Sequence, residues 1–445
     1  MTGTSFSRRR LLTAATAAAA GLALNACAGR SLGDYAQVSG EVPDKFARRQ
    51  RVVLWSAFTS HNAEVLQTIV DGFNASQSDI YCEIQLFPGY NALDSKLAAS
   101  FAVSQVPDLV TLSDVNWNRY FLAEALEPLS GYFDASFRPD FYHPTFLKEG
   151  TIRNEIYWLP WARSTPLFYY NKEIFAGAGL PDRGPKTFTE LREWGRQLKG
   201  YKHNGSPVKM RAYNGKDDWY FQGSAWAFGG SYSDGMTSKL ASEETIAALE
   251  FDRAFIHDDQ MAYLASDVNG DFAAGVAASM CTSTGALTSL LKAAKFEIGA
   301  AFLPEEVQPG VPTGGSGLAI MRNASKTRKQ ATWELVKYLA QTGAPEWSLN
   351  TGYLPVTTSA LNSPKIQERN ARNPQYQVAQ DQLSLARPPD VMRRYVNELI
   401  SEMLIVLQKV YSANADPGET LREAVRNLDP AVQRVLPKYH RLVAP

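Results

Sequence analysis

The chain has 445 residues, with 45 basic and 45 acidic side chains and therefore no net charge. A neutral chain lacks the basic surface typical of nucleic-acid-binding proteins, and three cysteines are too few for a disulfide framework. Because single hydrophobic cores stop growing at about 250–300 residues, this length predicts two lobes.

The first residues are typical of an export signal. Arg8, Arg9 and Arg10 precede an Ala-rich apolar run from Leu11 to Ala26. This run is too short to cross a bilayer comfortably, and it ends in small residues, as signal peptides do. The arginines followed by two leucines resemble a twin-arginine signal.

Leu24-Asn25-Ala26-Cys27 resembles a lipobox, in which the cysteine becomes the lipid-modified N-terminus. We therefore expect residues 1–26 to be a signal peptide and Cys27 to carry the lipid. Residues 27–50 then form a polar tether at the extracytoplasmic face of the cell membrane. The alternative is a plain secretory signal with a chance cysteine.

The N-terminal half alternates between two periodicities. Strands are expected at residues 51–55, 80–86 and 108–112, and helices at 61–76 and 91–104. Strand–helix–strand alternation predicts a parallel, doubly wound sheet. Cys82, in the second strand, and Cys281 are expected to be buried free thiols.

The second half adds short strands and a helical C-terminal third. Further strands are expected at residues 280–282, 297–303 and 318–321, and helices at 188–199, 242–257, 328–341, 374–384, 391–411 and 418–435. Open α/β sheets bind ligands beyond the carboxyl ends of their strands, so two such lobes predict a cleft that closes about a hinge.

Catalytic signatures are missing from the sequence. The five histidines have no metal-ligand spacing, and no Walker A loop occurs. Thr313-Gly314-Gly315-Ser316-Gly317 places its last glycine one position too early for a nucleophile elbow. We therefore expect no enzyme, cofactor or metal, although paired carboxylates leave a glycosidase open as an alternative.

Several runs, in the same order along the chain, resemble the extracellular solute-binding lipoproteins of carbohydrate-type ABC importers. The resemblance is greatest to the branch that binds glycerol-3-phosphate or glycerophosphodiesters. The matching runs are Val106-Pro107-Asp108-Leu109-Val110, Ala162-Arg163-Ser164-Thr165-Pro166, Trp226-Ala227-Phe228-Gly229-Gly230, Ser283-Thr284-Gly285, Thr313-Gly314-Gly315-Ser316-Gly317 and Thr351-Gly352-Tyr353-Leu354-Pro355. The resemblance implies a hinged, two-lobe periplasmic-binding-protein-like α/β fold. It divides the chain into an N-terminal lobe (51–163 and 284–343) and a C-terminal lobe (164–283 and 344–445).

The same resemblance places the ligand contacts one by one. They are implied at Tyr90, Asp114, Ser164, Trp219, Ser283, Gly315, Tyr353 and Arg393, with Arg387 as a rival to Arg393. The residue types suit a polar solute, because carboxylates and hydroxyls read hydroxyl groups, aromatic faces stack on them, and arginine grips a phosphate.

One departure from the family concerns ligand charge. The family carries an apolar contact three positions before the tryptophan, whereas this chain has Lys216-Asp217-Asp218-Trp219. A carboxylate beside a phosphate-binding arginine weakens anion binding, so Asp218 is included among the ligand-binding residues and favours a sugar or amino sugar. A glycerophosphodiester such as glycerophosphocholine, or glycerol-3-phosphate, remains the alternative. The competing interpretation is that Asp217 and Asp218 lie in a solvated turn and do not contact the ligand.

The sequence therefore predicts a monomeric binding protein that captures a sugar-like solute and delivers it to ABC importer permease subunits. Closure would follow from contacts made only in the closed state. A secreted glycosidase and an adhesion lipoprotein are the other classes that stay open.

Overall fold

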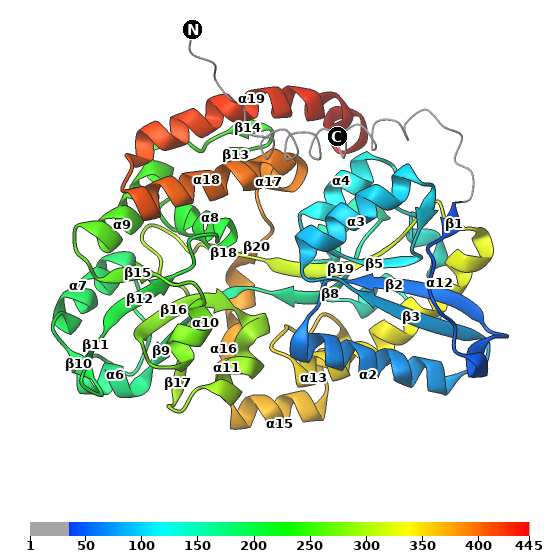
Figure 1. Ribbon diagram of the computed structural model, residues 1–445, viewed down its shortest axis with the longest axis horizontal. Helices are drawn as coiled ribbons and strands as arrows, with labels where there is room; N and C mark the ends of the chain where they lie inside the picture. The colour runs from blue at the N-terminus through cyan, green and yellow to red at the C-terminus, as the bar shows by residue number, and fades with distance from the viewer. Residues whose placement is uncertain (1–34, 445) are drawn as a thin grey trace, which may run out of the picture. The chain divides into compact units, whose positions relative to one another are not determined.

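The computed structural model describes residues 35–444, which form two compact units (Figure 1). Unit 1 contains the described part of Met1–Trp161 together with Ser316–Gly343. Unit 2 contains Ala162–Gly315 and the described part of Ala344–Pro445. Each unit holds one larger sheet flanked by helices, which confirms the expected fold class.

The sheet of unit 1 has five strands in the order β3-β2-β5-β19-β8. Their bounds are β2 (Gln50–Ser56), β3 (Ile80–Leu86), β5 (Leu109–Ser113), β8 (Leu159–Ser164) and β19 (Gly314–Ile320). β2 pairs in parallel with β3 and β5, whereas β19 is antiparallel to β5. β2 is buried from Val52 to Ser56, as expected for a strand covered on both faces.

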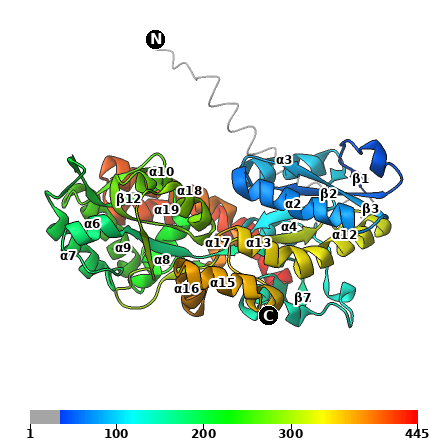
Figure 2. The same ribbon diagram turned by 90° about the horizontal axis from the view of Figure 1, so that it is seen from below.

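Four helices in the described part of unit 1 contact this sheet: α2 (Ser60–Ser76), α3 (Tyr90–Ala102), α4 (Asn116–Leu122) and α12 (Lys326–Tyr338) (Figure 2). The other helical segments of the unit are α5 (Pro144–Glu149), the short turns η2 (Asp44–Phe46), η3 (Ser130–Tyr132) and η4 (Pro139–Phe141), and the π-helix η6 (Leu339–Gly343). α2 buries Leu66, Ile69, Val70 and Phe73, whose spacing puts them on one face against β3. The strands and helices expected in the N-terminal half are confirmed to within about two residues.

The segment before β2 is part of unit 1, not a free tether. β1 (Ala36–Gln37) pairs in parallel with β4 (Gln105–Val106), and Val38 is buried. The main-chain oxygen of Val38 accepts a hydrogen bond of 3.0 Å from Arg51 Nη1. The expected tether over residues 27–50 is therefore wrong from Tyr35 onward. The expected signal peptide and Cys27 lie outside the described residues.

A buried ion pair joins the parts of unit 1. Arg328 of α12 contacts Asp108 through Nε at 2.5 Å, and the carboxylate also accepts a hydrogen bond of 2.8 Å from the main-chain N–H of Val53. Arg328 donates further to the carbonyls of Tyr35 and Val106. The pair therefore ties α12, β2, β5 and the N-terminal segment together.

The sheet of unit 2 also has five strands, in the order β15-β12-β16-β9-β17. Their bounds are β9 (Pro166–Asn171), β12 (Lys209–Tyr213), β15 (Ala262–Leu264), β16 (Ala277–Ser283) and β17 (Ile298–Ala301). β12 is parallel to β15 and β16, whereas β9 runs antiparallel between β16 and β17.

This antiparallel pairing corrects the predicted lobes. The segment 284–315 was assigned to the first lobe, but it belongs to unit 2. The physical reason is that β17 completes the sheet beside β9, and β18 (Val311–Pro312) pairs with β20 (Ala386–Arg387). The chain leaves unit 2 only at Gly315, inside β19.

The remaining helices belong to unit 2 (Figure 1). They are α6 (Lys172–Gly177), α7 (Phe188–Leu198), α8 (Asp218–Ala227), α9 (Glu243–His257), α10 (Val268–Ala273), α11 (Leu287–Ala293), α13 (Ala344–Asn350), α14 (Thr358–Leu361), α15 (Pro364–Arg372), α16 (Gln375–Gln382), α17 (Val391–Tyr395), α18 (Asn397–Ala413) and α19 (Pro417–Leu442). α18 and α19 pack against each other and against α9. The single helix expected over 391–411 is two helices, because Val396 adopts an extended conformation between them.

Short pairs and turns complete both units. They are β6 (Thr151–Ile152) with β7 (Glu155–Ile156), β10 (Lys202–His203) with β11 (Ser206–Pro207), β13 (Ser233–Asp234) with β14 (Thr237–Ser238), and the turns η5 (Thr284–Ala286) and η7 (Leu383–Leu385). Cys82 and Cys281 are buried free thiols, as expected. Over residues 35–444, no helix combines the length and the apolar character needed to cross a membrane.

Candidate functional site

Two predicted residues of unit 1 follow the ends of neighbouring strands. Tyr90 begins α3 shortly after β3, and Asp114 comes directly after β5. Because β3 and β5 are both parallel to β2, their carboxyl ends point to the same edge of the sheet, where open α/β sheets bind ligands. Gly89 adopts φ 94° before Tyr90, a conformation that favours glycine.

In unit 2, the chain around Tyr353 runs beside two predicted serines. Leu354 N donates to the carbonyl of Arg163 at 2.8 Å, which places Tyr353 next to Ser164. Thr284 N donates to the carbonyl of Thr165 at 3.0 Å, and Ser283 pairs with Pro166 at the start of β9, two residues after Ser164. The fold therefore brings Ser164, Ser283 and Tyr353 together from three separate parts of the sequence.

Close packing fixes the ring of Tyr353. A Cβ built on Gly285 would lie 2.9 Å from Cζ of this ring, so the glycine leaves just enough room for it. On another side the ring stacks on Trp347, with centroids 5.5 Å apart and an interplanar angle of 26°. Trp347 was missed as part of the site, because its sequence position looks like any apolar position of a buried helix.

Ser283 has a structural task besides any contact with a solute. Its Oγ accepts a hydrogen bond of 3.1 Å from the main-chain N–H of Gly285 and so caps the turn η5. Ser164 is almost fully buried at the end of β8. Accepting this bond leaves the Ser283 O–H as a donor, since a hydroxyl group has one donor and two acceptor positions.

Trp219 and Gly315 are held in place by main-chain carbonyl groups. The indole Nε1 of Trp219 donates to the carbonyl of Thr313 at 2.8 Å. Gly315 adopts φ 100°, and a Cβ there would lie 2.0 Å from the carbonyl oxygen of Ala162. The backbone conformation and the neighbouring carbonyl therefore require glycine at position 315, a reason that the sequence did not reveal. Ala162, which Gly315 contacts, precedes Ser164 by two residues in β8.

Two acidic residues precede Trp219, and each has a distinct partner. Asp217 caps α8, because its Oδ1 accepts a hydrogen bond of 3.0 Å from Tyr220 N. Burial raises the pKa of the Asp217 carboxyl to about 6. Asp218 forms an ion pair with Arg393, with Oδ2 and Nε 2.7 Å apart and side chains that are 9% and 6% exposed. The solvated turn considered for Asp217 and Asp218 is therefore wrong for Asp218.

The rival arginine occupies a different environment. The guanidinium of Arg387 lies over the ring of Trp226, 3.9 Å from its centroid. The main-chain carbonyl of Arg387 accepts a hydrogen bond of 2.9 Å from Thr313 N. Arg387 thus supports the Thr313 segment through its backbone, whereas Arg393 carries the buried charge beside Trp219.

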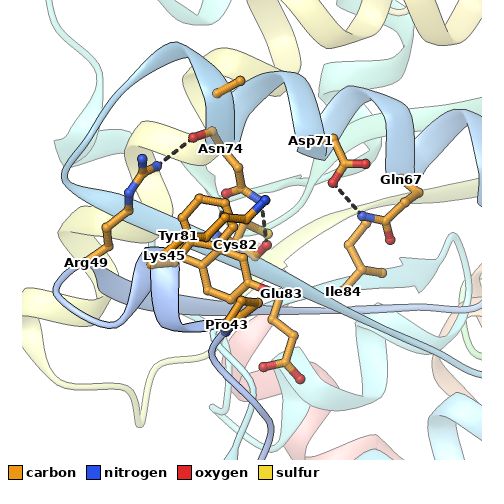
Figure 3. A pocket seen from close by; sticks show the side chains of 12 residues that line it. Pro43, Lys45, Arg49, Gln67, Asp71, Asn74, Tyr81, Cys82, Glu83 and Ile84 are labelled. Atoms are coloured by element: carbon orange, nitrogen blue, oxygen red, sulfur yellow. Dashed lines mark hydrogen bonds between the residues drawn. The ribbon is translucent and has the colours of Figure 1, made fainter.

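A cavity of about 650 Å³ lies elsewhere in unit 1, between η2, α2 and β3 (Figure 3). None of the predicted residues lines it. The Arg49 guanidinium beside it is held by the main-chain carbonyls of Asn74, Gln77 and Ile80. The Asn74 side chain bonds both N–H and C=O of Cys82, which closes part of the free edge of β3. We interpret these contacts as framework for the sheet edge.

The described part of the chain groups no three or more His, Cys, Asp or Glu side chains in a way that could hold a metal ion. The polar side chains assembled in unit 2 are hydroxyls, one acid–arginine pair and ring faces. Such groups can bind a polar solute through hydrogen bonds and stacking.

Known proteins that are similar in sequence bind solutes outside the cytoplasm. Residues 68–374 match the family of bacterial extracellular solute-binding proteins. The sn-glycerol-3-phosphate-binding periplasmic protein UgpB of Yersinia pestis bv. Antiqua (strain Antiqua) is 26% identical over 428 residues, covering 86% of this chain and 92% of that protein.

Solved structures extend the similarity to the fold. UgpB from Mycobacterium tuberculosis, in complex with glycerophosphocholine, is 32% identical with a TM-score of 0.80, covering 87% of this chain and 99% of that one. The ABC substrate-binding protein Lmo0181 from Listeria monocytogenes, in complex with cycloalternan, shares the fold at 18% identity, with a TM-score of 0.77 and 86% and 99% coverage. The chain therefore belongs to the bacterial extracellular solute-binding proteins, and it is a substrate-binding protein of an ABC importer rather than an enzyme.

Proposed function

We propose that this protein captures a small hydroxyl-rich solute, a sugar or an amino sugar. The observation that carries the proposal is the convergence of Ser164, Ser283 and Tyr353 in unit 2, through the main-chain bonds at Arg163 and Thr165. Short hydroxyls combined with a rigid ring face suit a ligand that presents both O–H groups and C–H faces.

Tyr90 and Asp114 are the residues of unit 1 that we propose as ligand contacts. Asp114 lies at the carboxyl end of β5 and is 8% exposed. A carboxylate in that position can accept hydrogen bonds from two sugar hydroxyls, or pair with the ammonium group of an amino sugar. Its loss would therefore remove a charged contact with the solute.

A glycerophosphodiester is the second candidate ligand. It is favoured by the similarity to the mycobacterial UgpB, whose structure holds glycerophosphocholine. The relatives named for sn-glycerol-3-phosphate support a phosphate-bearing ligand more weakly, at 26% to 28% identity. In this alternative Trp219 would contact the cationic head group and Arg393 the phosphate.

We also propose that the protein is exported through a twin-arginine signal and anchored by lipid at Cys27. It would work as a monomer at the extracytoplasmic face of the cell membrane and pass its solute to the permease subunits. The support is the sequence of residues 7–27, with its arginines, apolar run and lipobox. Acyl chains on the cysteine would be detected by mass spectrometry of protein from the membrane fraction.

The binding proposal is tested by a thermal-shift panel on the mature chain from Ala28. The panel contains sugars, amino sugars and glycerophosphodiesters. A ligand at about 100 times its Kd adds about 2.7 kcal/mol of stability. We expect a shift with at least one sugar or amino sugar, and we expect Asp114→Ala to abolish it. A normal shift in Asp114→Ala would place the site elsewhere, and a shift with glycerophosphodiesters alone would select the second candidate.

A further inference from the structure

We propose that Asp218 sets the charge selectivity of the binding site, because it is the built-in counter-ion of Arg393 and so disfavours phosphate monoesters. The inference rests on the proposed function, since it concerns the same group of residues in unit 2. It assigns Asp218 a role different from direct ligand contact. The residue acts on the ligand through the arginine that it neutralises.

The pair is preformed by the surrounding chain. Asp218 is the first residue of α8, and Arg393 lies in α17, 175 positions later. Tyr232 Oη donates to the main-chain carbonyl of Asp218 at 2.8 Å, and the next residue, Ser233, accepts a hydrogen bond of 3.0 Å from Met392 N through its Oγ. The β13 segment therefore holds the two helix ends together.

The pair also lies beside the predicted ligand contacts. Trp219 follows Asp218 directly, and its indole is fixed to Thr313 by a hydrogen bond of 2.8 Å. Gly314 packs against the ring, and Gly315 packs against Ala162 near Ser164. A charge on the Asp218–Arg393 pair is therefore felt by a solute that touches Trp219.

The geometry limits what Arg393 can offer to an anion. A guanidinium binds a phosphate best through two parallel N–H groups on one edge. Asp218 already accepts from Nε, so the edge that includes Nε is occupied. The carboxylate also cancels the positive charge and repels a dianion in a partly desolvated site. The occupied Nε edge and the cancelled charge reduce the binding of a neutral sugar or a zwitterionic head group only a little.

Charged groups of both signs surround the Asp218–Arg393 pair. Asp217 interacts with both members of the pair and with Arg211, and Tyr232 interacts with both members of the pair and with Asp390. Asp217 adds negative charge when it is ionised. Asp390 accepts hydrogen bonds from Trp226 Nε1 and Tyr232 N, and it also carries negative charge when ionised. Arg211 acts on Asp217 and Arg387 acts on Asp390, so each of these acids has a cation of its own, and the selectivity is assigned to the direct contact between Asp218 and Arg393.

The test is isothermal titration of the mature chain at pH 7.5 and low salt with three probes: maltose, glycerophosphocholine and sn-glycerol 3-phosphate. We expect the wild type to bind glycerol 3-phosphate at least tenfold more weakly than its better uncharged or zwitterionic probe. Asp218→Asn keeps the shape and removes the charge. It should tighten glycerol 3-phosphate binding at least tenfold and change binding of the better probe less than threefold.

Two further variants serve as controls, one for a general effect of removing an acid and one for misfolding. Asp429→Asn removes an exposed acid of α19 and should change no affinity. The double variant Asp218→Asn with Arg393→Gln leaves no uncompensated buried charge, so it remains a usable protein if Asp218→Asn alone does not fold. It should bind glycerol 3-phosphate no better than the wild type.

Three results would overturn the proposal while the proposed function stands. They are an unchanged glycerol 3-phosphate affinity in Asp218→Asn, an equal gain in Asp429→Asn, and a gain in the double variant as large as that in Asp218→Asn. If neither the wild type nor any variant binds one of these three probes or any member of the thermal-shift panel, the proposal and the ligand classes of the proposed function fail together.

Discussion

The indole of Trp219 lies directly on the backbone of Gly314. A Cβ at Gly314 would be 2.5 Å from Cζ2 of the ring, and the indole N–H is bound to the carbonyl of the preceding Thr313. The tryptophan therefore has one defined position, set by a glycine 95 residues further along the chain. Both residues belong to unit 2, so this arrangement does not depend on unit 1.

This contact predicts the effect of Gly314→Ala. The added methyl group cannot coexist with the ring, so the indole must move away from Thr313. We expect a loss of affinity for the solute of about tenfold, which corresponds to about 1.4 kcal/mol. Calorimetric titration measures it. Gly131→Ala is the control, since a Cβ there meets nothing within 4 Å. Unchanged affinity in Gly314→Ala would show that Trp219 does not contact the solute.

The ring and the hydroxyl of Tyr353 can be separated by substitution. Tyr353→Phe keeps the stacking on Trp347 and the packing on Gly285 but removes one hydroxyl. We expect affinity to fall about two- to tenfold, the net value of one hydrogen bond. Tyr353→Ala should lose more affinity and lower the melting temperature. Equal affinity in Tyr353→Phe and the wild type would leave only the ring in the binding role.

The buried pair of Asp108 and Arg328 predicts a large stability effect. Arg328→Met leaves a carboxylate without its cation in the interior of unit 1, because Asp108 has no exposed surface. We expect the free energy of unfolding to fall by about 3–5 kcal/mol, measured by urea denaturation. Arg372→Met is the matched control, since its partner Glu368 is exposed and such pairs contribute about 0–1 kcal/mol. Similar losses in both variants would contradict the prediction.

The raised pKa of Asp217 predicts a pH-dependent stability difference. Burial raises this pKa from 3.8 to about 6, so the folded protein holds the proton more tightly than the unfolded chain does. The resulting stabilisation is complete below pH 3.8 and is lost as pH rises through about 6. Asp217→Asn keeps a capping oxygen and does not titrate. Its melting temperature minus that of the wild type should therefore increase from pH 5 to pH 7.5, and a constant or decreasing difference would contradict the assignment.

Much of the candidate site was accessible from sequence, but the reasons for its residues were not. Tyr90 and Asp114 were placed by motif, and the parallel pairing of β3 and β5 with β2 explains why they share a sheet edge. Gly315 was expected to let a ligand approach, whereas the structure shows a positive φ and a neighbouring carbonyl that already require glycine. Trp347 escaped notice, because nothing local distinguishes a ring that supports a site from one that fills a core.

The sequence by itself determined the class of fold, most of the strands and helices, and the family. Periodicity and motif order are local properties of the chain, so they can be read without knowing what packs against what. Only the tertiary structure decided that the segment 284–315 joins unit 2, that the chain from Tyr35 onward docks on unit 1, and that Arg393 is paired with Asp218. Each of these depends on partners far apart in sequence, and the free energy of such contacts arises only once the intervening chain has folded.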